Sequence, residues 1–596
     1  MIRNATNRLA LNSGCRIIQN RFISSCSASQ QKHKEAIAPY SMKDSFRYSP
    51  EEGYIRTSAF NDVSMQNMTI DQYIWQDLNK FQDKCAIKCG ETGREYTYAQ
   101  LRDHTSALAV RFQTQFGLKQ GDVLAICLPN IPEFAIAALA TIEAGIVATS
   151  VNPIYTSDEI CKQLLSSGAK LIIGIPEIHS VLQTAIAQTK KPIKIISIKT
   201  TEDQSLPADA INFYELIRTK DVNFGDLIKY DVLPSDTAIL PFSSGTTGTS
   251  KGVMLSHDNI VINCEQLHVP LPDTPLIDET TRDFQAVCPA VLPFFHIYGF
   301  TVCLMSKLKL RTKIISLPKF HPETFMKAVI VEKGSILHLV PPIILFLGGH
   351  PSITPKHVES VRVVVSGAAP IGSSDVERLI KKAPQCDFIQ GYGLTETSPA
   401  TLMSVKGCKN FASVGGPVSG TEAKIVDIND PTYKGLGPNE NGEVLVKGPN
   451  NMKGYLNNQQ ATDETLIADN WLRTGDLGHY DEDGYFYVTD RLKELIKVKG
   501  FQVPPAELEE ILRDHPKVVD AAVIGIPHET HGELPHGYVV AKEGVQVSEK
   551  ELQDYVAQKV SAFKHLDGGI TFTKQIPKNA TGKIMRRQLK EEWATR

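Results

Sequence analysis

A segment rich in glycine and hydroxyl residues is the part of the sequence best suited to bind a polyphosphate. It spans residues 243–252 (SSGTTGTSKG) and follows an apolar stretch, residues 237–240, that is typical of a buried strand. Glycines let backbone N–H groups approach an anion, hydroxyl groups add donors, and Lys251 adds a mobile positive charge. The spacing is not that of a Walker A loop, because Gly245 and Gly248 are too close together and no Ser or Thr directly follows Lys251. Surface turns share this composition, but the adjoining apolar strand favours a phosphate-binding loop.

Two later segments carry groups that suit the rest of a nucleotide. Residues 361–370 (VRVVVSGAAP) predict a buried strand that ends in small residues, against which a flat ring can lie, although a simple tight turn would have the same composition. Residues 390–397 (QGYGLTET) offer an aromatic ring, hydroxyl groups and a carboxylate. Glu396 suits Mg²⁺, which favours one or two carboxylates together with phosphate oxygens and water.

The C-terminal part of the sequence adds a carboxylate and several cations. Asp476 could accept hydrogen bonds from both hydroxyl groups of a ribose, and Arg491 could add a donor. The basic run 491–499 could also be a solvated charged face. Lys583 follows a glycine in the sequence NATGKI, and this pair alone does not indicate a function.

Taken together, these segments resemble the adenylate-forming enzymes: acyl-CoA synthetases, 4-coumarate–CoA ligases and firefly luciferase. The resemblance extends from about residue 60 to the end, and the CoA ligases of the 4-coumarate type are the most similar. One departure is Ser250, where the family usually has proline before the lysine. The resemblance implies a carboxylic acid, ATP and CoA as substrates, Mg²⁺ as cofactor, and two steps: formation of an acyl-adenylate, then of a thioester. A luciferase-like enzyme that passes the acyl group to another acceptor is the alternative.

The resemblance also assigns roles to individual residues. Those implied in ATP and AMP binding are Ser243, Ser244, Gly245, Thr246, Thr247, Gly248, Lys251, Ala368, Gln390, Gly391, Tyr392, Thr395, Asp476, Arg491, Lys493 and Lys497. Those implied in catalysis are Lys583, Thr395, Glu396, Lys497, Gln502 and His296, with Glu396 as the metal ligand. Those implied in CoA binding are Lys319, Lys499 and Gly500, and Lys493 would be the hinge between domains.

An acid-binding pocket is implied around the sequence VLPFFHIYG, residues 291–299. Its members would be His296, Tyr298, Val302 and Met403. A histidine among apolar residues is also commonly a hydrogen-bonded core residue. Val302 lies where hydroxycinnamate ligases often have a smaller side chain, which argues against a strictly plant-like phenolic pocket. The other pocket residues are mostly apolar, so we expect a largely apolar acid, either fatty or aryl.

The elements that must hold these residues alternate between short apolar strands and helices. Residues 123–128, 171–174 and 193–198 predict strands, and a helix is expected from about Ile131 to Gly145. This alternation indicates an α/β fold whose large N-terminal domain has mostly parallel sheets flanked by helices. By resemblance a small mobile α/β domain follows, which gives domains at 41–492 and 493–596.

Composition excludes several other classes of protein. The net charge of −3 argues against nucleic acid as the main partner. Eleven scattered cysteines indicate a reducing compartment rather than a disulfide framework. The uncharged run 287–306 contains two prolines, a histidine and a glycine, so we interpret it as buried core and not as a transmembrane segment. The sequence does not indicate the oligomeric state.

The N-terminal segment has the composition of a mitochondrial transit peptide. Residues 1–34 contain arginine and lysine but no acidic residue, with Ser, Asn and apolar residues interspersed. We therefore expect residues 1–40 to direct import into mitochondria. A disordered basic tail on a cytoplasmic protein is the alternative. The final residues, Ala-Thr-Arg, are not the peroxisomal Ser-Lys-Leu signal.

Overall fold

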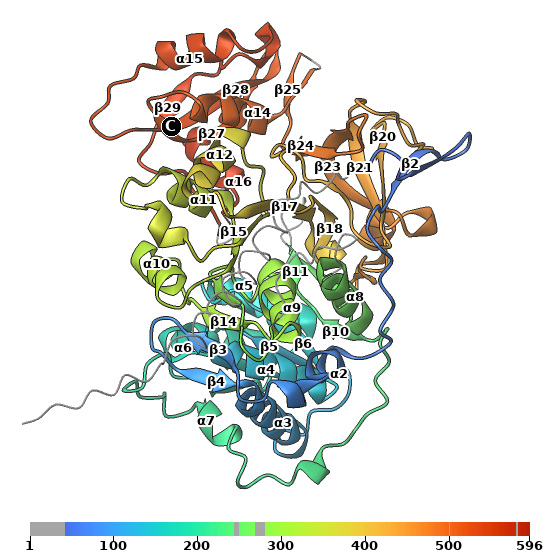
Figure 1. Cartoon of the computed structure of the whole chain (residues 1–596), viewed down its shortest axis with the longest axis vertical. Helices are drawn as coiled ribbons and strands as arrows, with labels where there is room; N and C mark the ends of the chain where they lie inside the picture. Colours follow the sequence, from blue (N-terminus) through green and yellow to red (C-terminus); the bar gives the residue numbers. More distant parts are fainter. Residues whose placement is uncertain (1–41, 244–249, 269–279, 500, 580–581, 596) are drawn as a thin grey trace, which may run out of the picture. The chain divides into compact units, whose positions relative to one another are not determined.

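The computed structural model describes residues 42–243, 250–268, 280–499, 501–579 and 582–595 (Figure 1). The predicted transit segment and six of the candidate site residues lie outside these ranges: 1–40, Ser244, Gly245, Thr246, Thr247, Gly248 and Gly500. From Met42 onward the chain forms one compact unit. No described helix combines the length and the apolar character needed to cross a bilayer.

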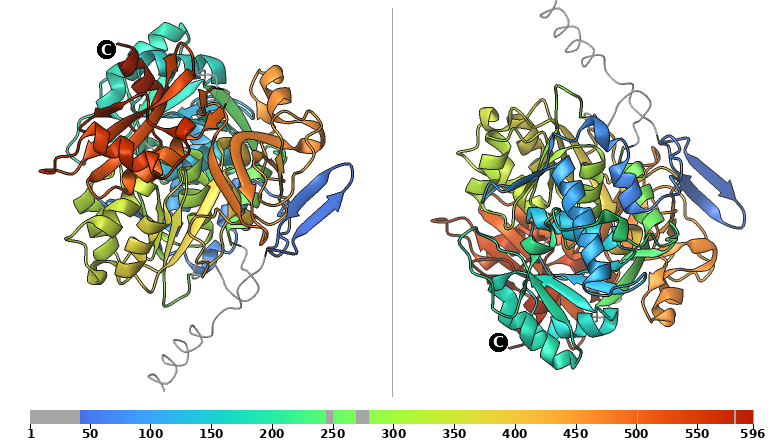
Figure 2. Two further views of the ribbon diagram at one scale, coloured as in Figure 1. Left: turned by 90° about the horizontal axis from the view of Figure 1, so that it is seen from above. Right: turned by 90° about the horizontal axis from the view of Figure 1, so that it is seen from below.

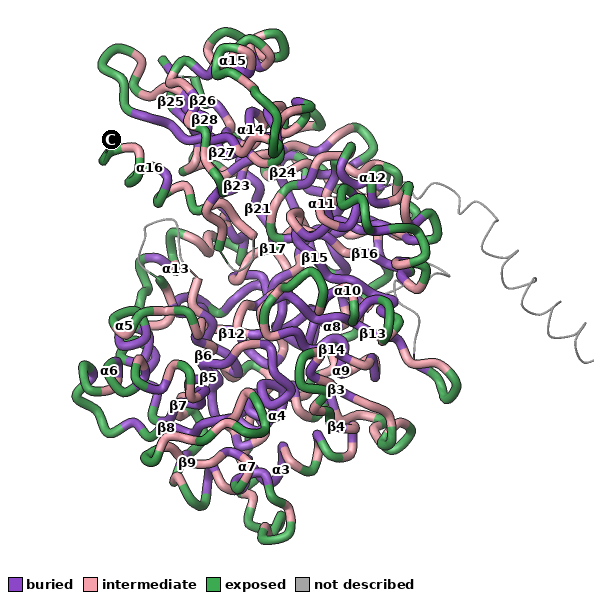
Figure 3. Tube along the Cα trace, turned by 90° about the vertical axis from the view of Figure 1, so that its left-hand side faces the viewer, coloured by how far each residue is buried: buried purple, intermediate pink, exposed green. Residues whose placement is uncertain are grey.

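The first large sheet consists mainly of parallel strands and contains the two strands that flank the predicted phosphate loop. Within the described residues its order is β11-β12-β10-β6-β5-β7-β8-β9, with β22 paired to β12. The bounds are β5 (Val123–Ile126), β6 (Val147–Ser150), β7 (Leu171–Gly174), β8 (Lys194–Ser197), β9 (Ile211–Asn212), β10 (Thr237–Ile239), β11 (Phe242–Ser243), β12 (Lys251–Ser256) and β22 (Gly454–Tyr455). Most residues of β5 to β8 are buried (Figure 3).

Crossover helices connect these strands, as parallel pairing requires. They are α4 (Pro132–Glu143), α5 (Ser157–Ser167) and α6 (His179–Thr189). The local sequence of α5 explains both of its ends. Thr156 and Glu159 form a capping box at its start, and Gly168 ends it with a φ of 70°, a conformation that glycine adopts without strain.

Two further sheets combine three parallel strands with antiparallel edges. One has the order β13-β14-β3-β4, with β13 (Val287–Ala290), β14 (Lys313–Ser316), β3 (Cys85–Cys89) and β4 (Glu95–Thr97). The other has the order β15-β16-β17-β18-β19, with β15 (Ile336–Leu339), β16 (Val363–Ser366), β17 (Asp387–Gly393), β18 (Ala400–Met403) and β19 (Gly416–Pro417).

Helices surround these sheets (Figure 2). They are α2 (Ile70–Trp75), α3 (Tyr98–Thr114), α7 (Phe213–Leu216), α8 (His257–His268), α9 (Ser306–Lys309), α10 (Pro322–Ile330), α11 (Pro341–Gly349) and α12 (Ser373–Lys382). A π-helix, η4 (Tyr298–Met305), runs directly into α9 and contains the candidate residues Tyr298 and Val302. The uncharged run that contains η4 is largely buried core, as expected from its sequence.

A six-stranded sheet is antiparallel throughout, which the strand and helix alternation did not predict. Its order is β1-β2-β20-β21-β23-β24, with β1 (Phe46–Ser49), β2 (Gly53–Thr57), β20 (Glu422–Val426), β21 (Gly442–Lys447), β23 (Leu472–Tyr480) and β24 (Phe486–Arg491). The N-terminal hairpin therefore pairs with strands that come more than 300 residues later, as the blue and orange arrows of Figure 1 show. Helix α13 (Gln459–Thr465) precedes β23.

A separate C-terminal sheet follows β24. Its order is β26-β25-β28-β27, with β29 paired to β28; the bounds are β25 (Ile496–Val498), β26 (Phe501–Val503), β27 (Val518–His528), β28 (Gly532–Ala541) and β29 (Ile570–Phe572). Helices α14 (Pro505–Arg513), α15 (Glu549–Ala557) and α16 (Arg586–Ala594) accompany it (Figure 1). This region has a hydrophobic core of its own. The predicted α/β fold, with a large N-terminal part and a smaller C-terminal part, is confirmed.

Candidate active site

The best-defined part of the site is a buried carboxylate shared by an aromatic residue and an arginine. The Tyr392 hydroxyl donates to Asp476 Oδ2 at 2.6 Å, and Arg491 Nε lies 3.1 Å from Asp476 Oδ1. Asp476 and Arg491 are directly opposed on β23 and β24, whereas Tyr392 comes from β17 in another sheet. Burial raises the pKa of Asp476, and the Arg491 guanidinium opposes this rise.

These three residues lie on the wall of a cavity of about 860 Å³. Eight of the candidate residues line it: Ala368, Gln390, Gly391, Tyr392, Asp476, Arg491, Gln502 and Lys583. They come from β16–β17, from the antiparallel sheet and from the C-terminal region, which are far apart in the sequence. A cavity of this size falls in the range of small-molecule sites.

Lys583 reaches this cavity from the C-terminal loop that precedes α16. The neighbouring Gly582 has a φ of 78°, and a Cβ at this position would lie 3.2 Å from Val340 Cγ2. A glycine therefore allows the loop to pack closely against the N-terminus of α11. Burial lowers the pKa of Lys583, the positive charge of Arg491 lowers it further, and the carboxylates of Glu494 and Asp476 oppose the shift.

An ionic network that the sequence analysis did not identify holds Lys583 in place. Lys583 Nζ lies 3.6 Å from Glu494 Oε1, and Glu494 also pairs with Arg586, which pairs with Glu509 at 2.8 Å. Glu494 is the single acidic residue within the basic run 491–499, and this position could have indicated from the sequence that it pairs with a nearby cation. Nothing in the sequence indicated that Arg586 would be its partner.

Glu396 is held by two hydroxyl groups. Its Oε1 accepts hydrogen bonds from Ser243 Oγ and from Tyr455 Oη, each at 2.9 Å. Lys251 Nζ lies 4.8 Å from the centre of the Tyr455 ring, close enough for a cation–π interaction. Tyr455 therefore links the strand that leaves the phosphate loop to the 390–397 motif. Sequence reasoning missed it, because only the pairing of β22 with β12 brings it here.

The segment predicted to lie against adenine follows β16 and lines the large cavity at Ala368. Ala368 has a φ of 72°, in the left-handed region that non-glycine residues rarely adopt and that is often found at functional sites. The preceding residue, Gly367, allows the Tyr298 ring to pack against the backbone, because a Cβ at this position would lie 2.9 Å from Tyr298 Cε1. The segment predicted to lie against adenine and the predicted acid pocket therefore meet where Gly367 packs on the Tyr298 ring.

The candidate acid residues Tyr298, Val302 and Met403 meet in one hydrophobic cluster. His296 lies beside it and accepts a hydrogen bond from the Tyr298 backbone N–H at its Nδ1 (3.2 Å). Burial lowers the pKa of His296 to about 4, so the ring is neutral near pH 7 and carries its proton on Nε2.

Several candidate residues lie outside the large cavity. Lys497 and Gln502 are paired across the β25–β26 hairpin, but only Gln502 lines the cavity. Lys499 and Lys319 are exposed, and Lys493 is exposed in the turn between β24 and β25. Thr395 lies on the η6 turn (Thr395–Thr397) beside Glu396. The cavity thus brings together Tyr392, Asp476, Arg491 and Lys583, whereas Thr395 and the described residues implied in CoA binding do not line it.

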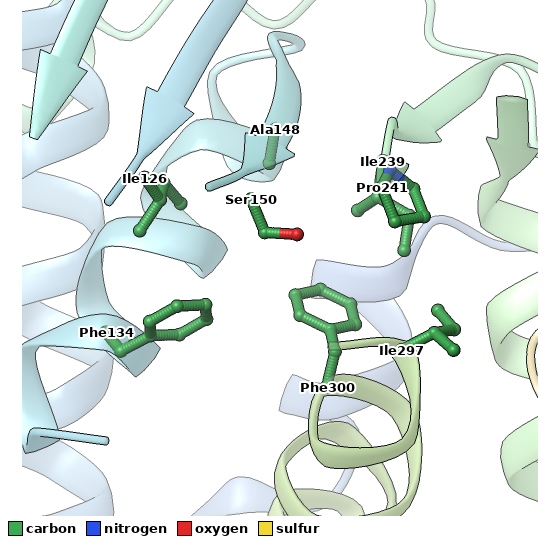
Figure 4. A pocket seen from close by; sticks show the side chains of 8 residues that line it. All are labelled: Ile126, Phe134, Ala148, Ser150, Ile239, Pro241, Ile297 and Phe300. Atoms are coloured by element: carbon green, nitrogen blue, oxygen red, sulfur yellow. The ribbon is translucent and has the colours of Figure 1, made fainter. Parts of the chain in front are cut away.

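A second cavity is too small to be a ligand site. It has a volume of about 10 Å³, roughly the space of one water molecule. Its lining is apolar except for Ser150 (Figure 4). The Ser150 hydroxyl donates to the Phe295 carbonyl at 2.7 Å. We interpret it as a packing defect between β5, β6, β10 and the start of η4.

Two family models match this chain in the regions that build the site. The model of the AMP-binding enzyme matches residues 74–456, and that of the AMP-binding enzyme C-terminal domain matches residues 507–583. The chain therefore belongs to the AMP-binding enzyme family.

Individual relatives agree with this assignment. A protein of Dictyostelium discoideum named "Probable 4-coumarate–CoA ligase 1" is 37% identical over 90% of this chain and 97% of its own length. The 4-coumarate–CoA ligase 3 of Arabidopsis thaliana is 36% identical over 94% of this chain and 98% of its own length. Among solved structures, ATP-bound MatB from Rhodopseudomonas palustris superimposes with a TM-score of 0.76 at 26% identity, covering 88% of this chain and 99% of MatB.

Proposed function

We propose that this chain is an ATP-dependent, AMP-forming acid–CoA ligase. The carboxylate of an acid attacks the α-phosphorus of ATP, which gives an acyl-adenylate and pyrophosphate; the CoA thiol then displaces AMP and forms a thioester. The observation that carries the proposal is the convergence of Asp476, Arg491 and Lys583 on one cavity in a member of the AMP-binding enzyme family.

The nucleoside would be held by the residues of the buried carboxylate cluster. Asp476 Oδ1 is buried and lacks an aligned hydrogen-bond donor among the described residues, despite its ion pair with Arg491. Such an orphaned acceptor is costly unless a ligand supplies the donor. A ribose hydroxyl would supply it, while Tyr392 and the Ala368 backbone would enclose the adenine.

In the first step this chain contributes charge and position rather than a nucleophile. Two anions must approach each other, so the Lys583 ammonium would lie between the acid carboxylate and the α-phosphate, with the Thr395 hydroxyl as a further donor. Fixed donors and cations in a partly desolvated cavity stabilise the charge that develops in the transition state.

The residues around Glu396 fit a magnesium ion. No cluster of three or more His, Cys, Asp or Glu suited to a metal occurs among the described residues. Mg²⁺ does not need such a cluster, since it commonly uses one carboxylate with phosphate oxygens and water. Among the described residues, Ser243 and Tyr455 hydrogen-bond the Glu396 carboxylate, and both do so at Oε1. The ion would neutralise phosphate charge, and Glu396 would hold it.

Tyr455→Phe should lower the rate of pyrophosphate release about tenfold, because it removes a hydrogen bond to a charged carboxylate. The ring under Lys251 would remain, so Tyr455→Leu should have a larger effect. Titration calorimetry with Mg²⁺ and ATP together should also show weaker binding for Tyr455→Phe. A wild-type rate and a wild-type binding isotherm in this variant would show that Tyr455 does not position Glu396.

The second step would require a different set of residues from the same small domain. Lys499, Gly500 and Lys319 would contact CoA, and Lys497 and Gln502 would serve thioester formation. We propose that the domain 493–596 turns about Lys493 between the two steps, relative to the domain 41–492.

The acid is proposed to have a largely apolar body. Tyr298, Val302 and Met403 offer an apolar wall. The relatives named 4-coumarate–CoA ligases make an aryl acid a natural first candidate, and a fatty acid remains the second. Pyrophosphate release, measured across acids of different length and ring content, tests the proposal. We expect medium-chain or aryl acids to exceed acetate; release with none of the acids would refute the function.

We also propose that residues 1–40 direct the protein into mitochondria. Their basic composition without acidic residues supports this. A fluorescent fusion of the full chain should co-localise with mitochondria, whereas a fusion that begins at Ser41 should not. If both fusions remain in the cytosol, the targeting proposal is wrong.

A further inference from the structure

Two histidines meet at the turn that joins β27 and β28 of the C-terminal sheet (Figure 1). His528 is the last residue of β27, and His531 directly precedes β28. Their Nδ1 atoms lie 3.1 Å apart. The ring centroids are 4.6 Å apart, and the ring planes are nearly perpendicular, at 86°. The turn therefore brings one nitrogen of each ring to the same small region.

A threonine between the two histidines adds an oxygen to this cluster. Thr530 Oγ1 lies 2.7 Å from His531 Nδ1 and 3.5 Å from His528 Nδ1. The Thr530 backbone N–H donates to His528 Nδ1 at 3.4 Å, so this nitrogen carries a lone pair and not a proton. Two ring nitrogens this close need a proton or a cation between them, because two lone pairs repel each other. A proton on His531 Nδ1 meets this need, and a metal ion could take its place.

The distance between the two nitrogens is that of two imidazole ligands on one metal ion. Zn–N bonds are about 2.0–2.1 Å long, so two nitrogens on one zinc ion lie about 2.9–3.4 Å apart for angles of about 90–110°. The observed 3.1 Å falls in this range. A pair of imidazoles suits zinc, copper or nickel, whereas Mg²⁺ prefers oxygen ligands. The cluster therefore differs in kind from the magnesium site proposed at Glu396.

The backbone of the C-terminal sheet holds the turn from both sides. His528 is directly opposed to Gly532 in the β27–β28 ladder. On the other side Gly532 is paired with Val498 of β25, and the Lys499 N–H donates to the His531 carbonyl at 2.8 Å. The two rings are thus carried by a backbone that is already ordered. Such preorganisation lowers the entropic cost of binding a ligand.

The exposure and the charges around the turn permit a cation to bind. His528 is exposed and His531 is half-buried. Desolvation lowers the pKa of His531, Lys499 and His528 lower it further, and Asp567 opposes the shift, so the ring is neutral near pH 7. The Lys499 ammonium would weaken the binding of a cation, and the exposed carboxylates of Glu529 and Asp567 would offset this. Neither histidine lines the large cavity.

We propose that the turn 528–531 binds one divalent ion of the zinc and copper class through the Nδ1 atoms of His528 and His531. Water completes the coordination, because no cluster of three or more His, Cys, Asp or Glu suited to a metal occurs among the described residues. The proton of the His531 ring then resides on Nε2. The bound ion also stabilises the contact of the turn with Lys499. The site lies outside the candidate active site, and the inference does not depend on the proposed ligase function.

Titration calorimetry with Zn²⁺, on the full chain purified without a histidine tag, tests the binding. We expect one site per chain that an excess of Mg²⁺ does not displace. His531→Gln and His528→Gln should each weaken binding at this site by at least about 10- to 100-fold, the loss that follows even from removal of an outer-shell partner of a metal ligand. His321→Gln, which changes an exposed histidine of the large N-terminal part, is the matched control and should bind as the wild type does.

Two further measurements locate the ion. Cu²⁺ bound at the turn should give an electron paramagnetic resonance spectrum with couplings to two imidazole nitrogens, and each single histidine variant should lose one of them. Amide hydrogen exchange should slow in the peptide that contains Lys499 when Zn²⁺ is added, because the Lys499 N–H donates to the His531 carbonyl. In His531→Gln, Zn²⁺ should leave this exchange unchanged.

Several outcomes would overturn the inference. The wild type could bind no Zn²⁺, or it could bind Zn²⁺ with the same affinity as both histidine variants, which would place the ion elsewhere on the chain. Exchange at Lys499 that is unaltered by bound Zn²⁺ would also place the ion elsewhere. Thermal unfolding without metal checks that each variant is folded, and these substitutions at the turn should leave it close to that of the wild type.

Discussion

Lys583→Ala should lower the rate of acyl-adenylate formation by about 10²- to 10³-fold, the loss expected on deletion of one preorganised charged donor. The Lys583 ammonium is the group that the C-terminal loop brings into the cavity beside Asp476 and Arg491. Without it, the repulsion between the acid carboxylate and the α-phosphate is not offset in the first step. Thioester formation from pre-made acyl-adenylate should be affected much less.

Two half-reaction assays on one preparation check this expectation. Pyrophosphate release reports the first step, and acyl-CoA formed from added adenylate reports the second. Lys574→Ala, an exposed lysine in the same C-terminal segment, is the matched control and should behave as the wild type. Equal losses in both half-reactions would contradict the role given to Lys583.

The rate of the first step should depend on pH through the protonation of Lys583. Burial lowers the pKa of Lys583, and adenylation is expected to need its protonated form. The rate should therefore decline on the alkaline side at a lower pH than an ordinary lysine would allow. Glu494→Gln removes a carboxylate that opposes this shift, so it should move the decline to still lower pH. A profile unaltered by Glu494→Gln would show that the ionic network does not tune Lys583.

Lys493→Pro should preserve appreciable acyl-adenylate formation and abolish most thioester formation. The turn between β24 and β25 is closed by the Glu494 N–H, which donates to the Arg491 carbonyl at 2.9 Å. Lys493 is the third residue of this turn, where proline would force Leu492 out of the helical region and fix its own φ near roughly −65°. The short linker could then not absorb the change between two domain orientations.

The position of Lys583 in this structure explains why Lys493→Pro should still form the acyl-adenylate. Lys583 lies in the cavity, whereas Lys499 is exposed outside it, an arrangement suited to adenylation. Lys493→Ala removes the same side chain but leaves the backbone free, and it should support both steps. If Lys493→Pro forms thioester from added adenylate at the wild-type rate, the hinge lies elsewhere.

Local patterns in the sequence predicted the elements and many of the candidate residues. Periodicity and turn residues placed β7 at its observed bounds and α4 within two residues of them, because both elements are fixed by their own side chains. The motifs around Tyr392, Asp476 and Lys583 were recognisable because each carries its chemical groups within a few consecutive positions.

What the sequence did not predict depends on pairing between distant segments. The antiparallel sheet joins β2 to β20, and no local pattern indicates that contact. Tyr455 meets Glu396 only because β22 pairs with β12. Likewise, no local pattern indicated that His338 on β15 would be paired with Val365 on β16.

The most direct test of the central claim follows both products of one reaction by mass spectrometry. The purified chain is incubated with ATP, Mg²⁺ and a panel of aryl and medium-chain acids, with and without CoA. We predict acyl-adenylate and pyrophosphate without CoA, and acyl-CoA with AMP when CoA is added. An adenylate that forms but never passes to CoA would contradict the ligase assignment and favour another acceptor, and no adenylate with any acid would contradict the adenylating function itself.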